Sequence, residues 1–454
     1  MEKWSGAYAF VKVLAYYTFW LSHKRIAVIG KENIPRNKPI IFAPNHQNAL
    51  MDPLAVLLTN YTQPVWMARA DIFKLKATRP VLNFLKIVPV YRIRDGKKNL
   101  SKNKRTFDIA VRVLENKKAI ALFPEAAHTG KRQMIMHKKA IPRIAFLAEE
   151  KSDFNLDVQI VPVGIYYNHY WSFNRSVLIN YGKPIHVAGY EKIFRENEHT
   201  AIIALRDEIY KAMLSLVLNI NSREFYDDYE LMLKIAGPRY ARTKNFNRDK
   251  FINRFFSDKE LTGKIELLEK QDPESFKSLI GEIRLLNRQL VKLHLQGSNV
   301  RKLRSSDYVL LFVQLVAGIF SLSLFLPGFI FNGLQFLILR KVISNKVKDP
   351  LFRGSFNMVA GMLLFPVIHI VIATALGIAA GSLFLALFLF LVMLPLGKLS
   401  YQLFGFYRQI IRNIRIADIN IFRNRELSSI VLLKKEVRNK IIDTAGNNSA
   451  IFDA

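Results

Sequence analysis

The chain has 454 residues, half of them apolar, and its 67 lysines and arginines outnumber its 36 aspartates and glutamates, which gives a net charge of +31. This combination favours a membrane surface or an anionic substrate. The chain contains no cysteine, which excludes disulfides, a thiolate nucleophile, cysteine-ligated zinc and iron–sulfur clusters.

The first 24 residues are rich in aromatic side chains, among them Trp4, Phe10, Tyr16 and Trp20. Aromatic rings at this density suit the boundary between lipid headgroups and acyl chains. Residues 1–24 are therefore predicted to form an N-terminal interfacial membrane helix. A helix buried against the next domain is the alternative.

Residues 25–195 alternate short apolar segments with amphipathic ones, which predicts an α/β domain. The strands are expected at residues 25–29, 39–43, 64–68, 87–92, 118–123, 158–165 and 176–180. The helices are expected at residues 48–59, 105–116 and 138–150.

Residues 196–306 change to charged sequence with a helical period, which predicts a helical region. Its helices are expected at residues 199–219, 222–235, 258–270 and 275–296. The sequence does not indicate whether this region covers an active site or binds a partner.

Two long runs without a formal charge follow, at residues 308–339 and 354–397. Because a span needs about 20 apolar residues, a C-terminal transmembrane α-helical segment is expected over residues 307–400. His369 lies in the second run and is predicted to form an interhelical hydrogen bond.

Basic clusters precede, separate and follow the two runs, and positively charged loops stay in the cytoplasm. The pattern predicts two helical hairpins, with turns at Pro327–Gly328 and Gly377–Gly381 and an even number of crossings. One crossing plus a buried helix is the alternative. Residues 401–454 are then a basic cytoplasmic tail.

A histidine and an aspartate, His46 and Asp52, follow the apolar segment Ile40–Ala43 in a turn that opens a helix. A histidine that loses its proton near neutral pH, held by a carboxylate, is what a general base requires. Taken alone, the pair fits a structural role as well as a catalytic one.

Three further segments follow in order: the first ends a strand with two arginines, the second ends one with a carboxylate, and the third is a strand containing proline. They are Val88–Asp95, Ala121–Glu125 and Ile160–Ile165. Together with the His46 segment they resemble the four motif blocks of the glycerophospholipid acyltransferases, the family of glycerol-3-phosphate and 1-acylglycerol-3-phosphate (lysophosphatidate) acyltransferases. The resemblance covers roughly residues 25–190 and is closest to the fungal-type membrane glycerol-3-phosphate acyltransferases.

The chain departs from the family pattern in two places. The family usually has four residues between its histidine and its aspartate, whereas five separate His46 from Asp52, a spacing that the fungal-type enzymes share. The Gly-Thr-Arg-Ser that usually follows the Pro-Glu pair is replaced by Ala126–Thr129, which removes the expected arginine.

The resemblance implies a reaction without a covalent intermediate on the enzyme. His46 removes the proton from an acceptor hydroxyl, which attacks an acyl thioester, while Asp52 orients the imidazole. The absence of cysteine and of a Gly-x-Ser-x-Gly motif agrees with direct transfer.

The remaining site residues are predicted to bind the acceptor. Arg92 is the leading phosphate ligand and Arg94 the second, because a guanidinium matches a phosphate; Lys131 and Arg132 are the alternatives. Glu125 either binds the acceptor's free hydroxyls or caps the adjacent turn.

The predicted function is thus a membrane-bound O-acyltransferase acting on glycerol-3-phosphate in phosphatidic acid biosynthesis. Acylation of lysophosphatidate to phosphatidate is the alternative, and a basic membrane scaffold, in which His46 would be dispensable, is the non-enzyme alternative. The expected partners are the bilayer, the acceptor, and acyl-CoA or an acyl-carrier protein as donor, with no metal or other cofactor. Nucleic acid is disfavoured because the basic residues are dispersed. The catalytic domain is expected on the cytoplasmic face.

Overall fold

The structure is a computed structural model that describes residues 4–91, 101, 103–127, 129–170, 173–295, 300–348 and 350–447. The chain divides into two compact units. The first contains the chain up to Val217 together with Val347–Met358, and the second contains Leu218–Lys346 and the chain from Val359.

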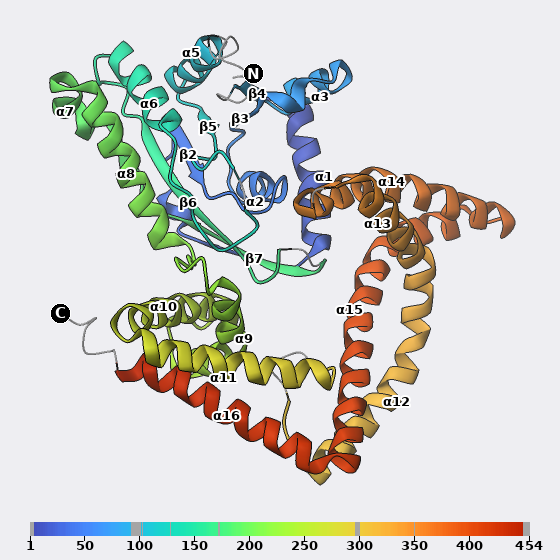
Figure 1. Cartoon of the computed structure of the whole chain (residues 1–454). Coiled ribbons are helices and arrows are strands. Elements are labelled where there is room, and N and C mark those ends of the chain that lie inside the picture. Colours follow the sequence, from blue (N-terminus) through green and yellow to red (C-terminus); the bar gives the residue numbers. More distant parts are fainter. Residues whose placement is uncertain are drawn as a thin grey trace. The chain divides into compact units, whose positions relative to one another are not determined.

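The described part of the first unit contains a mixed sheet of eight strands (Figure 1). The strands are β1 (His23–Ile29), β2 (Ile40–Pro44), β3 (Val65–Arg69), β4 (Ile87–Val90), β5 (Ala119–Ala121), β6 (Gln159–Tyr167), β7 (Arg175–Tyr181) and β8 (Ile185–His186). Their order is β1-β7-β6-β2-β5-β3-β4, with β8 paired to β6. Strands β7 and β8 run antiparallel to β6, and the other pairs are parallel. The predicted α/β domain is confirmed, and each predicted strand overlaps an observed one.

Helices cover both faces of this sheet because the central strands are apolar on both sides. Ile41 and Ala43 of β2 belong to one core with α5 (Asn103–Glu115), α6 (Ala140–Lys151) and α8 (Glu198–Leu216). Phe42 points to the other face, where its ring meets Tyr181 edge-on. The Tyr181 hydroxyl bonds to α2 (Met51–Thr59), which contacts α1 (Gly6–Ser22).

Helix α8 belongs to the sheet unit, although the sequence places it at the start of the helical region 196–306. Its side chains Leu205, Ile209 and Met213 are buried in the core beside the sheet. The first segment of this unit therefore ends at Val217. The described part of this unit also contains α3 (Arg79–Phe84) and α7 (Glu191–Glu196).

The second unit contains a bundle of α9 (Tyr226–Thr243), α10 (Lys250–Gln271), α11 (Pro273–Lys292) and α16 (Asn424–Asn447). The described part of the segment predicted as a tail, residues 401–447, forms helices instead, with a break at Arg423. It completes α15 and then forms α16, which packs on α9, α10 and α11. Leu427, Ile430, Val437 and Ile441 are all buried, and their spacing forms an apolar stripe that needs a partner surface.

Three stretches of the described chain are helical and apolar enough, by length and composition, to cross a membrane: Ser305–Lys346, Phe352–Ala379 and Leu383–Phe422. They contain α12 (Ser305–Gly328), α13 (Leu334–Lys346), α14 (Pro350–Ala379) and α15 (Leu383–Phe422).

The first of the two predicted hairpins is wrong. The chain does not turn back at Pro327–Gly328, because a π-helical turn at Phe329–Gly333 joins α12 to α13 without a break. A wider helical turn is one way in which a helix accommodates a proline. The second predicted turn is confirmed, since Gly381 separates α14 from α15 with a left-handed φ of 61°.

Helices α12 and α15 pair antiparallel along their lengths through polar contacts. Starting from the beginning of α12, the pairs are Tyr308–Asn420, Gln314–Asn413 and Ser321–Tyr407, and Asn332 of the π-helical turn continues the series with Met393. His369 of α14 lies 3.3 Å from the Phe331 carbonyl, which confirms the predicted interhelical hydrogen bond.

The antiparallel pairing predicts which ends of these helices share a side of the membrane. The absence of cysteine allows single-cysteine variants Ser305→Cys, Asn424→Cys and Gly381→Cys, all at exposed positions, to be labelled with an impermeant maleimide. The first two should react from the same side of sealed membranes, and the third from the other. Permeabilised membranes, in which all three react, are the control. Labelling of Ser305→Cys and Asn424→Cys from opposite sides would contradict the pairing.

Candidate active site

The first residues of the site, Asn45 and His46, directly follow the carboxyl end of β2. Asn45 extends this edge of the sheet beyond the strand, because its side-chain amide donates to the Ile165 carbonyl at 3.2 Å and its oxygen accepts from the Ile165 N–H at 2.6 Å. The turn that follows is thereby fixed to β6. Ligand sites of α/β sheets lie at this end of the strands.

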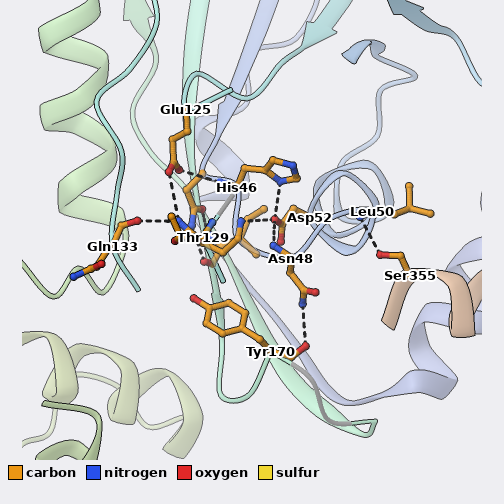
Figure 2. Close-up of polar contacts among 12 residues, drawn as sticks. His46, Asn48, Leu50, Asp52, Glu125, Thr129, Gln133, Tyr170 and Ser355 are labelled. Carbon is orange, nitrogen blue, oxygen red and sulfur yellow. Dashed lines mark hydrogen bonds and ion pairs between the residues drawn. The ribbon is translucent and has the colours of Figure 1, made fainter. Parts of the chain in front are cut away.

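His46 and Asp52 are in direct contact (Figure 2). His46 Nδ1 lies 3.0 Å from Asp52 Oδ2, and the same oxygen accepts the N–H groups of Gln47 and Asn48 at 2.7 Å each. Asp52 is fully buried, whereas the His46 side chain is 16% exposed. With Nδ1–H directed at a carboxylate, Nε2 is the nitrogen that can accept a proton from a substrate.

The turn between His46 and Asp52 contains an unusual backbone conformation. Ala49 adopts a φ of 40°, in the left-handed region that residues with a Cβ rarely enter. The next residue is held from outside the turn, because the Leu50 N–H donates to Ser355 Oγ at 3.1 Å (Figure 2). The five-residue spacing thus still brings the carboxylate to the ring.

Two stacked aromatic rings support the imidazole of His46, the first directly and the second through the first. The ring of His46 stacks on Phe123, with centroids 4.0 Å apart and planes 18° apart. Phe123 in turn stacks on Trp66 at 5.7 Å. Packing and the Asp52 bond together restrict the ring to one orientation.

Glu125 connects the His46 turn to the loop that follows β5 through hydrogen bonds to both. Its Oε1 accepts the His46 N–H at 3.0 Å, and its Oε2 accepts the Ile135 N–H at 3.1 Å. The side chain is 1% exposed. Burial raises the pKa of Glu125 to about 8, with a further contribution from Asp52, against the two backbone hydrogen bonds that lower it.

Gln47 is a site residue that the sequence analysis missed. Its amide nitrogen donates to the Gln133 carbonyl at 3.0 Å, and its oxygen accepts from the Thr129 hydroxyl at 2.9 Å. The side chain is buried and joins the His46 turn to the loop after Glu125. The only signal in the sequence is a polar residue inside the motif.

The four predicted phosphate ligands have different positions. Arg92 and Arg94 lie outside the described residues. Lys131 is exposed in the loop after Glu125. Arg132 is buried, and it donates to the carbonyls of the β6 end, Tyr167 and Asn168, at 3.2 and 3.3 Å, with its guanidinium over the Tyr166 ring. Of the two that are described, Lys131 is the better placed to meet a ligand from solvent. Within the described ranges, no cluster of three or more His, Asp or Glu side chains could hold a metal ion.

Residues 25–166, which lie within the sheet domain, match the family model described as acyltransferase. The chain is 24% identical over 303 residues to glycerol-3-phosphate O-acyltransferase 2 of Saccharomyces cerevisiae, covering 61% of this chain and 39% of that protein. It is 27% identical over 249 residues to an uncharacterised acyltransferase of Schizosaccharomyces pombe, covering 53% and 35%. The chain thus spans well under half the length of both yeast relatives.

A bacterial relative is matched over a shorter part of the chain. The 1-acyl-sn-glycerol-3-phosphate acyltransferase of Borreliella burgdorferi is 24% identical over 203 residues, covering 43% of this chain and 74% of that protein. Among solved structures, the 1-acyl-sn-glycerophosphate acyltransferase PlsC of Thermotoga maritima matches with a TM-score of 0.34 and 20% identity, covering 46% and 78%.

The bonds of Glu125 predict how its variants behave. Glu125→Ala leaves the N–H groups of His46 and Ile135 without their acceptors, at a cost of about 1–3 kcal/mol for each buried donor. We expect a lower denaturation midpoint and a lower kcat, and a smaller loss in Glu125→Gln, which keeps one acceptor. A raised KM for the acceptor with an unchanged midpoint in both variants would instead show that Glu125 binds substrate hydroxyls.

The raised pKa of Glu125 adds a pH dependence to the same experiment. Because the folded state favours the protonated acid, the stabilisation is complete below the unfolded pKa near 4.5 and is lost as the pH rises through about 8. The midpoint of the wild-type protein should therefore fall between pH 5 and 9 by more than that of Glu125→Gln. Parallel curves for the two proteins would contradict this assignment.

Proposed function

We propose that the chain is a membrane-bound O-acyltransferase that transfers a fatty acyl group from an acyl thioester to glycerol-3-phosphate. The observation that carries the proposal is the 3.0 Å contact between His46 Nδ1 and Asp52 Oδ2 at the end of β2, inside the domain that matches the acyltransferase family. The three apolar helical stretches support attachment to a membrane.

The proposed reaction is a direct transfer. His46 Nε2 removes the proton from the acceptor hydroxyl, and the oxygen attacks the thioester carbonyl carbon. The tetrahedral intermediate collapses, the carbon–sulfur bond breaks, and the proton passes from the imidazolium to the leaving thiolate. Asp52 stabilises the imidazolium between these two proton transfers. The donor is acyl-CoA or an acyl-carrier protein, which present the same thioester.

Glycerol-3-phosphate is the preferred acceptor for two reasons. The relative whose name contains this substrate aligns over 61% of the chain, against 43% for the relative named for the acylated acceptor. The five-residue spacing between His46 and Asp52 also resembles the fungal-type enzymes. Acylation of lysophosphatidate is the second candidate, and the catalytic domain is proposed to face the cytoplasm.

The acceptor is tested by competition on membranes that contain the protein. Glycerol-3-phosphate and lysophosphatidate are offered at equal concentration with one labelled acyl thioester. Labelled lysophosphatidate should be the main first product. Predominant labelling of phosphatidate from the added lysophosphatidate would reverse the choice of acceptor and leave the role of His46 unchanged.

Replacement of the proposed base tests the mechanism. His46→Ala should lower kcat by about a hundredfold to ten-thousandfold, as expected for loss of a general base. The chain offers a matched control, because His186 and Asp157 form a second histidine–aspartate pair, 3.2 Å apart, on the surface. His186→Ala should retain wild-type kinetics. Equal activity in His46→Ala and His186→Ala would place the chemistry elsewhere.

A further inference from the structure

The first turns of α14 belong to the same compact unit as the candidate active site. Helix α14 provides the apolar stretch Phe352–Ala379, yet Val347–Met358 groups with the sheet and not with the other apolar helices. Ser355 and Met358, three residues apart on one face of the helix, are both buried, whereas Phe356 between them is 52% exposed. The Ser355 face of this segment is therefore covered by the protein.

Ser355 binds the backbone of the turn that carries the proposed catalytic pair. Its Oγ accepts the Leu50 N–H at 3.1 Å, and the two residues are 305 positions apart in the sequence (Figure 2). Leu50 is the N-cap of α2, and its side chain makes no capping hydrogen bond. Because the first N–H groups of a helix have no acceptor within that helix, this one needs an acceptor from elsewhere. The Ser355 hydroxyl supplies it.

The Leu50 N–H lies within the His46 turn (His46–Asp52). Ala49, directly before it, has a left-handed φ of 40°, and a conformation of this kind persists only where the surrounding contacts hold it. One such contact lies inside the turn, where the Met51 N–H donates to the Asn48 carbonyl at 2.9 Å. The bond to α14 is a second contact, and it holds the turn from outside.

The position of Leu50 affects how Asp52 meets the imidazole. Asp52 Oδ2 accepts two N–H groups from residues before Leu50 and lies 3.0 Å from His46 Nδ1. Leu50 stands between those donors and Asp52 in the chain, so a shift of its backbone moves the carboxylate relative to the ring. A misplacement of about 1 Å in a catalytic site can lower the rate about a hundredfold.

We propose that Ser355 is a positioning residue for the His46–Asp52 pair, and that the first turns of α14 thereby form part of the active site. This inference rests on the proposed function. The Ser355 hydroxyl holds the start of α2, α2 carries Asp52, and Asp52 orients the imidazole that acts as the base. The apolar segment thus contributes to turnover in addition to its proposed attachment to a membrane.

The test compares kcat and KM of the full chain in membranes between wild type, Ser355→Ala and Ser355→Thr. Ser355→Ala leaves the Leu50 N–H without its acceptor and should lower kcat by about tenfold or more. The KM values for donor and acceptor should stay within about twofold of wild type, because the hydroxyl acts on the catalytic pair and not on a substrate. Ser355→Thr, which restores a hydroxyl, should recover most of the lost kcat.

Ser400 of α15 offers a matched control. Ser400 and Ser355 are each 4% exposed, but Ser400 Oγ donates to the Phe325 carbonyl of α12 at 3.0 Å, so its bond joins two apolar helices. Ser400→Ala should keep the kcat of wild type. The proposal is overturned if Ser355→Ala keeps it too, or if Ser355→Thr or Ser400→Ala loses as much as Ser355→Ala. Should the alanine variant fail to accumulate, Ser355→Cys, whose thiol is a weak acceptor, gives the same comparison.

A second readout does not depend on catalysis. Hydrogen–deuterium exchange with mass spectrometry can follow the Leu50 amide in peptides that cover the His46 turn. This amide should exchange faster in Ser355→Ala than in wild type or Ser400→Ala, because a hydrogen bond protects an amide from exchange. Faster exchange in a chain that transfers no acyl group would reject the proposed function and retain the role of Ser355 in holding the turn. Unchanged exchange in an active chain would do the reverse.

Discussion

One carboxylate oxygen, Asp52 Oδ2, accepts three hydrogen bonds, and the candidate active site depends on them. Two come from backbone N–H groups of the turn after β2, and the third comes from the imidazole. The oxygen therefore fixes the shape of the turn and the orientation of the ring together.

Much of the fold could be predicted because its elements are short and strongly patterned. Apolar strands that alternate with amphipathic helices indicated the sheet domain, and its parallel strands bring their carboxyl ends to one edge. The failures lie where a pattern has two explanations. In α16, basic residues lie between the apolar residues of the buried stripe, so the segment was predicted as a tail. Pro327–Gly328 was predicted as a turn, although a π-helical turn keeps the chain helical there.

The candidate site was predictable to the extent that its residues lie in ordered motifs. The contact between His46 and Asp52 was expected, whereas the left-handed Ala49 in the turn between them was not, because only the backbone reveals it. Glu125 proved to have two backbone partners, which favours the capping alternative over a purely ligand-binding role. Gln47 escaped notice because a polar residue in a turn resembles a solvated one until its burial is known.

The packing of α16 has a consequence for the order in which the second unit is completed. The chain leaves the bundle after α11, passes through the apolar helices, and returns with α16. During synthesis from the N-terminus, α9, α10 and α11 emerge first, yet the surface that receives α16 stays exposed until the ribosome has synthesised α16 itself. The apolar helices are made in the interval. Closure of the bundle is thus delayed until those helices have left the ribosome, so the final folding step of this unit follows their synthesis.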